Sequence, residues 1–213
     1  MKRPVGILIS GRGSNMQALI TAARHPAYPA RIALVLSNRP DAAGLTTAQH
    51  AGIQTAVIDH RQFGNDRAAH EAALDARLRE VAVEIVCLAG YMRLLTPFLV
   101  KAWQGRMLNI HPSLLPSFPG LHTHARALQA GVKLHGCTVH LVTDQVDEGP
   151  ILAQAAVPVL SGDSQHDLAA RVLRQEHVIY PAALAAFAAG IAATDPPAES
   201  YLASPLPSLG NLE

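Results

Sequence analysis

Residues 5–15 read Val5-Gly6-Ile7-Leu8-Ile9-Ser10-Gly11-Arg12-Gly13-Ser14-Asn15. The first five are a continuous apolar run, typical of a parallel strand buried on both faces of its sheet. A glycine-rich turn follows, and apolar residues then recur at helical spacing at Met16, Leu19 and Ile20. A strand, a glycine-rich turn and a helix are the first half of a β-α-β unit, so this stretch predicts the class of the fold.

The same alternation continues along the chain. Further strand patterns lie at Ile32–Leu36, Gln54–Ile58 and Glu84–Leu88, and helical patterns lie between them at Ala42–Ala51 and Ala68–Arg79. Strands that alternate with helices form a mostly parallel sheet through right-handed crossovers. We therefore expect an α/β fold with a doubly wound, Rossmann-like sheet and helices on both faces.

The second half of the chain predicts a mixed sheet. After a helix near His124–Ala130, two strand patterns at Cys137–Thr143 and Pro150–Val157 are joined by an acidic turn, as in a hairpin with a long loop. Such a hairpin would form an antiparallel edge. A long helix is expected from its N-cap Ser164, and Pro181 is expected to kink or split it.

Composition limits the class of protein. The chain has 213 residues, a net charge of +1 and 49% hydrophobic residues, which fits one soluble domain over 1–193 and a proline-rich mobile tail over 194–213. No dense Lys/Arg run indicates a nucleic-acid surface, and no apolar stretch is long enough to span a membrane. Cys87 and Cys137 lie in apolar runs, as expected for buried free thiols in the cytoplasm.

Asn109 and His111 are the first candidates for chemistry. Met107, Leu108 and Ile110 predict a short buried strand that stops before Pro112, and side chains two apart share one face of a strand. An amide can donate to a developing oxyanion, and an imidazole can exchange a proton near neutral pH. The alternative is that both side chains cap the strand.

The glycine-rich turn predicts an anion site. Free backbone N–H groups at a helix N-terminus bind phosphate, and Gly13, Ser14 and Asn15 would supply them. A dinucleotide-binding site is the alternative. Its glycine motif requires a third glycine, where this chain has Met16, and an acidic residue at the end of the second strand, where this chain has Arg39 nearby and no acidic residue. A tight turn without a ligand also stays open.

Five ordered motifs resemble one family: Ser10–Asn15, Leu88–Arg93, Asn109–Pro116, Gly120–His124 and Asp144–Pro150. Together they are similar to the folate-dependent glycinamide ribonucleotide formyltransferases of de novo purine biosynthesis. The resemblance implies a formyltransferase-type Rossmann-like fold, with a nucleotide-binding N-terminal half and a folate-binding C-terminal half. It also implies transfer of a formyl group from 10-formyltetrahydrofolate to the amine of glycinamide ribonucleotide, without a metal.

The resemblance implies Asn109, His111 and Asp147 as the catalytic residues. Asp144 is the neighbouring competitor for the last role, and an acidic residue in a turn is often only a turn residue. The resemblance also implies the phosphate contacts of Gly13, Ser14 and Asn15, and substrate contacts at Gly90 and Glu176. The implied folate-binding residues are Arg67, Met92, Arg93, Leu94, Leu95, Asn109, Thr143 and Asp144.

Some of these assignments leave alternatives. Arg67 is equally expected as a solvated helix residue, and Arg93 could pair with a folate carboxylate or bond the pterin by its backbone. The chain departs from the family at Leu173, where a substrate-binding glutamine is expected; Gln175 or water would have to replace its contacts.

Rival functions are a formyltetrahydrofolate hydrolase, which would use the same residues on water, and a non-catalytic nucleotide or folate sensor. A formyltransferase acting on initiator tRNA would need a nucleic-acid-binding extension and a basic surface. His122 and His124 lack the spacing of a metal site, and we expect them to order their loop or touch substrate. A homodimer is compatible with the sequence.

Overall fold

The computed structural model describes residues 1–190. Seven strands form one sheet in the order β3-β2-β1-β4-β5-β6-β7. The strands are β1 (Arg3–Ile9), β2 (Ala30–Ser37), β3 (Thr55–Val57), β4 (Ile85–Leu88), β5 (Met107–His111), β6 (Leu134–Leu141) and β7 (Ile151–Pro158). Pairs among the first five are parallel, and β5–β6 and β6–β7 are antiparallel. The expected mixed, doubly wound sheet is confirmed.

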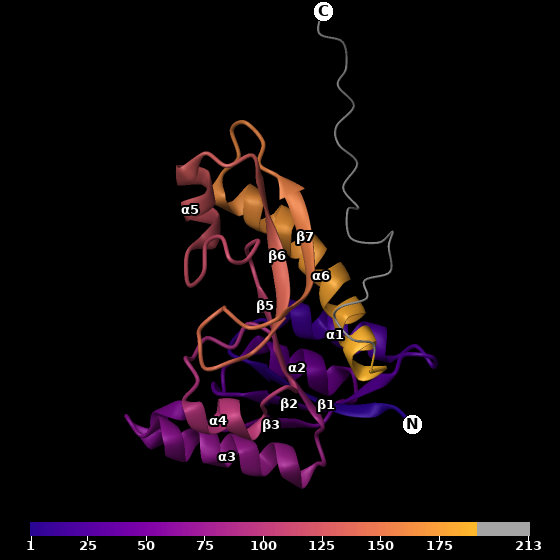
Figure 1. Ribbon diagram of the computed structural model, residues 1–213. Helices are drawn as coiled ribbons and strands as arrows, with labels where there is room; N and C mark the ends of the chain where they lie inside the picture. The colour runs from indigo at the N-terminus through magenta and orange to yellow at the C-terminus, as the bar shows by residue number, and fades with distance from the viewer. Residues whose placement is uncertain (191–213) are drawn as a thin grey trace, which may run out of the picture.

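Helices cover both faces of the sheet (Figure 1). They are α1 (Ser14–Ala23), α2 (Ala43–His50), α3 (Arg67–Glu80), α4 (Pro97–Ala102), α5 (Thr123–Ala130) and α6 (Gln165–Ala188), with a short 3-10 helix at His60–Phe63. Side chains alternate along β1, so Ile7 and Ile9 join the core under α1, α2, α5 and α6, whereas Leu8 joins the core under α3 and α4. Both cores are apolar and hold the carboxyl ends of the strands in fixed positions.

Helix α6 corrects one expectation. It runs without a break from Gln165 to Ala188, so Pro181 does not split it. Pro181 lacks an N–H and forfeits one helical hydrogen bond. Its neighbours Tyr180, Ala183 and Leu184 are buried in the core, and this packing holds the helix together across the proline. Helix α4 was not expected, because six residues are too few to show a helical period.

The other elements agree with the sequence patterns to within a few residues. β6 begins at Leu134, three residues before the expected start, and the expected alternation of Cys137, Val139 and Leu141 toward the core is confirmed. Cys87 and Cys137 are buried free thiols. Within residues 1–190 no helix is long and apolar enough to cross a membrane. The predicted tail, 194–213, and the last residues of the predicted domain lie outside the described residues.

Candidate active site

The carboxyl ends of β1, β4 and β5 meet at one edge of the sheet. The chain leaves β1 toward β2 on one side and reaches β4 on the other, so β1 and β4 flank the point where the strand order reverses. Ligands of open α/β sheets bind in the crevice at this point. The glycine-rich turn follows β1, Gly90 follows β4, and Asn109 and His111 end β5. The fold therefore brings the predicted phosphate site and the predicted catalytic residues to the same edge.

His111 faces Asp147 across the site. His111 Nδ1 lies 3.4 Å from Asp147 Oδ2, and the two side chains are 8% and 10% exposed. The other ring nitrogen, Nε2, lies 3.2 Å from the carbonyl oxygen of Phe118. Because a carbonyl can only accept, Nε2 carries a proton, and a second proton on Nδ1 makes the contact with the Asp147 carboxylate attractive. Both ring nitrogens therefore face acceptors, which is the hydrogen-bonding pattern of an imidazolium.

Asn109 is oriented by His140 of β6, which lies directly opposite it in the antiparallel register. His140 Nδ1 lies 2.9 Å from the carbonyl oxygen of Leu141, so its proton sits on Nδ1 and Nε2 can accept. Asn109 Nδ2 lies 3.2 Å from that Nε2. Burial lowers the pKa of His140, which keeps it a neutral acceptor. The amide of Asn109 is thus held with its NH₂ group toward the histidine, and its second N–H remains for a ligand.

Neighbouring histidines are neutral near pH 7. Burial lowers the pKa of His124, and burial together with His124 lowers the pKa of His135 to about 4. The two rings contact each other, with His135 Nε2 3.2 Å from His124 Nδ1. They add no positive charge around His111. His124 lies in α5 and contacts His135, and its role in the loop or toward substrate stays a prediction.

The glycine-rich turn begins α1 as predicted. Gly13 is the N-cap in a left-handed conformation with φ of 71°, which glycine adopts without a steric penalty, and no side chain caps the first N–H groups. Asn15 is buried, and its Nδ2 donates to Oε2 of Glu176 at 2.6 Å. Its Oδ1 is buried without a hydrogen-bond partner in the described structure. Two residues 161 positions apart, both predicted to contact substrate, thus lie side by side.

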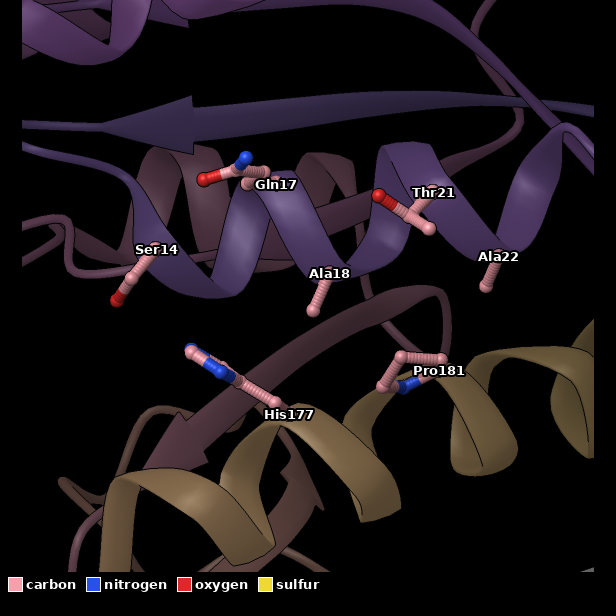
Figure 2. Close-up of a pocket in the computed structure, with 7 residues that line it drawn as sticks. All are labelled: Ser14, Gln17, Ala18, Thr21, Ala22, His177 and Pro181. Carbon is pink, nitrogen blue, oxygen red and sulfur yellow. The ribbon is translucent and has the colours of Figure 1, made fainter. Parts of the chain in front are cut away.

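A shallow hollow of about 450 Å³ extends this site between α1 and α6. Figure 2 shows Ser14 and Ala18 on α1 facing His177 and Pro181 on α6. Glu176 directly precedes His177, and burial raises the pKa of its carboxyl group. Leu173, the departure from the family pattern, is half-buried one helical turn before it, so it offers no polar group here.

Apart from Asn109 on β5, the predicted folate-binding residues lie on three segments: the loop after β4, the first turn of α3 and the loop between β6 and β7. Met92 and Leu94 are 69% and 62% exposed, which is unusual for apolar side chains at the end of a central strand. Arg93 and Leu95 share their loop and are half-buried, and Arg67 is exposed on the first turn of α3. Glu71 of α3 accepts hydrogen bonds from the backbone and side chain of Thr96, which ties that loop to the helix.

The third segment is the loop between β6 and β7, residues 142–150. Thr143 is half-buried and Asp144 is exposed, whereas Asp147 turns inward with φ of 58°. Of the two competing acidic residues, Asp147 is therefore the one that contacts His111. Residues 1–190 contain no group of three or more His, Cys, Asp or Glu side chains arranged to hold a metal ion.

Comparison with known proteins places these features in one family. The pattern of the family described as "Formyl transferase" matches residues 3–184. The chain belongs to this formyl transferase family.

Relatives of this formyl transferase are both short and long proteins. Phosphoribosylglycinamide formyltransferase of Escherichia coli is 48% identical over 184 residues, which are 86% of each chain. The trifunctional purine biosynthetic protein adenosine-3 of Homo sapiens is 51% identical over 189 residues, and the chain spans only 19% of its length. The crystal structure of the phosphoribosylglycinamide formyltransferase of Brucella melitensis superposes with a TM-score of 0.85 at 58% identity, over 90% of this chain and 98% of that one.

Sequence patterns missed two features of this formyl transferase site. His140 lies on a strand predicted to be antiparallel, and pairing that strand with β5 would have placed a histidine opposite Asn109. The second feature is a hydrogen-bond network behind the glycine-rich turn. Ser10 Oγ donates to Asn38 Oδ1 at 2.6 Å and accepts from the N–H of Met92 at 2.8 Å. No local sequence pattern predicts this network, because its residues follow three different strands.

Proposed function

We propose that this protein transfers a formyl group from 10-formyltetrahydrofolate to the amine of glycinamide ribonucleotide, as a step of purine biosynthesis. The observation that carries the proposal is the convergence of Asn109, His111 and Asp147 at the edge that also presents the glycine-rich turn. The match to the Escherichia coli phosphoribosylglycinamide formyltransferase over most of both chains supports the choice of substrate.

The catalytic residues fit the charge changes of this reaction. The substrate amine attacks the formyl carbon, a C–N bond forms, and the carbonyl oxygen becomes an oxyanion. The free N–H of Asn109 and a cationic His111 stabilise that oxygen; loss of one such donor costs about 2.7–4 kcal/mol in comparable sites. The bond to the folate nitrogen then breaks, the carbonyl re-forms, and the proton lost by the amine reaches the departing nitrogen. In this proposal His111 and Asp147, in contact at 3.4 Å, hold that proton in transit.

The ribonucleotide binds at the start of α1 in this proposal. The backbone N–H groups of Gly13, Ser14 and Asn15, together with the helix dipole, would hold the phosphate. Glu176 and Gly90 would contact the ribose and glycinamide parts. Oδ1 of Asn15 is buried without a hydrogen-bond partner in the described structure, and in this proposal it accepts a hydrogen bond from the substrate.

The folate would lie across the opposite loops. Met92, Leu94 and Leu95 give an apolar wall for the pterin, and Thr143, Asp144 and Asn109 add polar contacts at its edges. The cations Arg67 and Arg93 suit the carboxylates of the folate tail. We further propose that the enzyme works in the cytoplasm on small molecules without a metal; a homodimer stays a prediction.

The steady-state rate of folate deformylation tests the proposal when measured with and without glycinamide ribonucleotide. A transferase deformylates folate only when the ribonucleotide is present. Equal rates in its absence would instead show a formyltetrahydrofolate hydrolase, and no turnover under either condition would show a binding protein. Formylation of initiator tRNA by the same preparation would also reject the ribonucleotide as the substrate.

A further inference from the structure

The segment Phe118–Leu121, between β5 and α5, contacts both members of the His111–Asp147 pair. The carbonyl oxygen of Phe118 accepts from Nε2 of His111 at 3.2 Å. Two residues later, the N–H of Gly120 donates to Oδ2 of Asp147 at 2.8 Å. The first contact requires a proton on Nε2 of His111, and the second fixes the carboxylate oxygen that faces Nδ1.

The backbone in and directly after this segment takes a left-handed conformation at several residues. Phe118 has φ of 56°, Gly120 has φ of 76°, and His122, immediately after the segment, has φ of 57°. Side-chain-bearing residues rarely adopt the left-handed region, and they stay there only where their surroundings enforce it. Something outside the segment must therefore keep the Phe118 carbonyl aimed at His111.

Arg126, on the first turn of α5, supplies that restraint from one side. Its guanidinium donates to the carbonyl of Pro119 and lies 3.5 Å from that of Leu121. Its Cζ is 5.6 Å from the centre of the Phe118 ring, within the range of a cation–π contact. On the other side, the ring of His135 meets that of Phe118 at 76° with centres 5.8 Å apart. The Phe118 ring thus packs between the guanidinium of Arg126 and the neutral imidazole of His135.

We propose that Arg126 is a positioning residue for the reaction. It acts through Phe118–Leu121, keeping the Nε2–H of His111 hydrogen-bonded to the Phe118 carbonyl and keeping Asp147 turned toward Nδ1. The effect on rate rests on the proposed function, whereas the effect on the hydrogen bond does not.

Arg126→Met tests this role, because it removes the donors and the charge while keeping an unbranched apolar stem. Arg126→Gln is the milder variant, and Arg31→Met, at the exposed amino end of β2, is the matched control. The readouts are the ¹H chemical shift and the solvent-exchange rate of the His111 Nε2 proton, assigned by its loss in His111→Asn, and kcat with both KM values.

We expect wild-type protein and Arg31→Met to show a downfield, slowly exchanging proton on Nε2 of His111. Arg126→Met should move this proton upfield, speed its exchange with water and lower kcat by about ten- to a hundredfold, as small misplacements of catalytic groups produce, with Arg126→Gln between them. An unchanged Nε2 proton in Arg126→Met overturns the proposal, even if the rate or the melting temperature falls, because the role would then be structural only. If Arg126→Met does not fold, an unchanged Nε2 proton in Arg126→Gln overturns it. Absence of formyl transfer by the wild type would reject the proposed function and leave the hydrogen-bond result intact.

Discussion

Replacement of Asp147 by asparagine isolates the charge of the His111–Asp147 pair. The amide has nearly the same shape and keeps an oxygen that can accept from the N–H of Gly120, so the loops should stay in place. What disappears is the negative charge 3.4 Å from His111 Nδ1. Two unit charges at that separation interact by about 5 kcal/mol at an effective dielectric constant of about 20. Desolvation of the buried pair offsets part of this, so that value is an upper bound.

We therefore expect kcat of Asp147→Asn to fall by about two to three orders of magnitude, or about 2.7–4 kcal/mol in activation free energy. The KM for the ribonucleotide should stay within about threefold, because its phosphate would bind elsewhere, at the start of α1. Steady-state kinetics with each substrate varied in turn measure both parameters, and thermal melting checks the fold. A kcat within threefold of wild type would refute the assignment of Asp147 to the chemistry.

Three further changes test other parts of the site. His140→Leu should lower kcat about ten- to a hundredfold with little change in KM, because Asn109 loses the acceptor that orients its amide; an equal kcat would mean that the amide orients itself. Gly44→Ala would place a Cβ 2.7 Å from Ile9 Cδ1 and 3.1 Å from the Gly11 carbonyl oxygen. Calorimetry should therefore show a free energy of unfolding lower by about 1–3 kcal/mol, and the KM for the ribonucleotide should rise. Because burial raises the pKa of Glu176, the folded state binds its proton more tightly than the unfolded state, and stability falls as pH rises above the ordinary value of that pKa. Glu176→Gln should therefore raise the melting temperature at pH 8 but not at pH 4, and a gain of equal size at both would show that the carboxyl is not the cause.

The sequence predicted the centre of the sheet because the central parallel strands are continuous apolar runs. Val5–Ile9 and Ile85–Leu88 are buried on both faces, so their composition alone marks them. Period-two spacing also predicted that Asn109 and His111 share a face, since Leu108 and Ile110, on either side of Asn109, point into the core beneath α6. These patterns are local, so they can be recognised from the sequence alone.

Contacts between distant segments could not be predicted in the same way. Whether Asp144 or Asp147 meets His111 depends on the left-handed turn at Asp147, which no composition rule assigns to an aspartate. The bond between Asn15 and Glu176 joins the first helix to the last. The family resemblance pointed to both residues, but their pairing follows from how α6 crosses α1.

The fate of the formyl carbon tests the central claim most directly. Wild-type protein would be supplied with 10-formyltetrahydrofolate carrying ¹³C in the formyl group, together with glycinamide ribonucleotide, and the label followed by ¹³C NMR. The account predicts that the label moves to the formamide of the ribonucleotide in step with loss of the folate signal. Label recovered as free formate would contradict it.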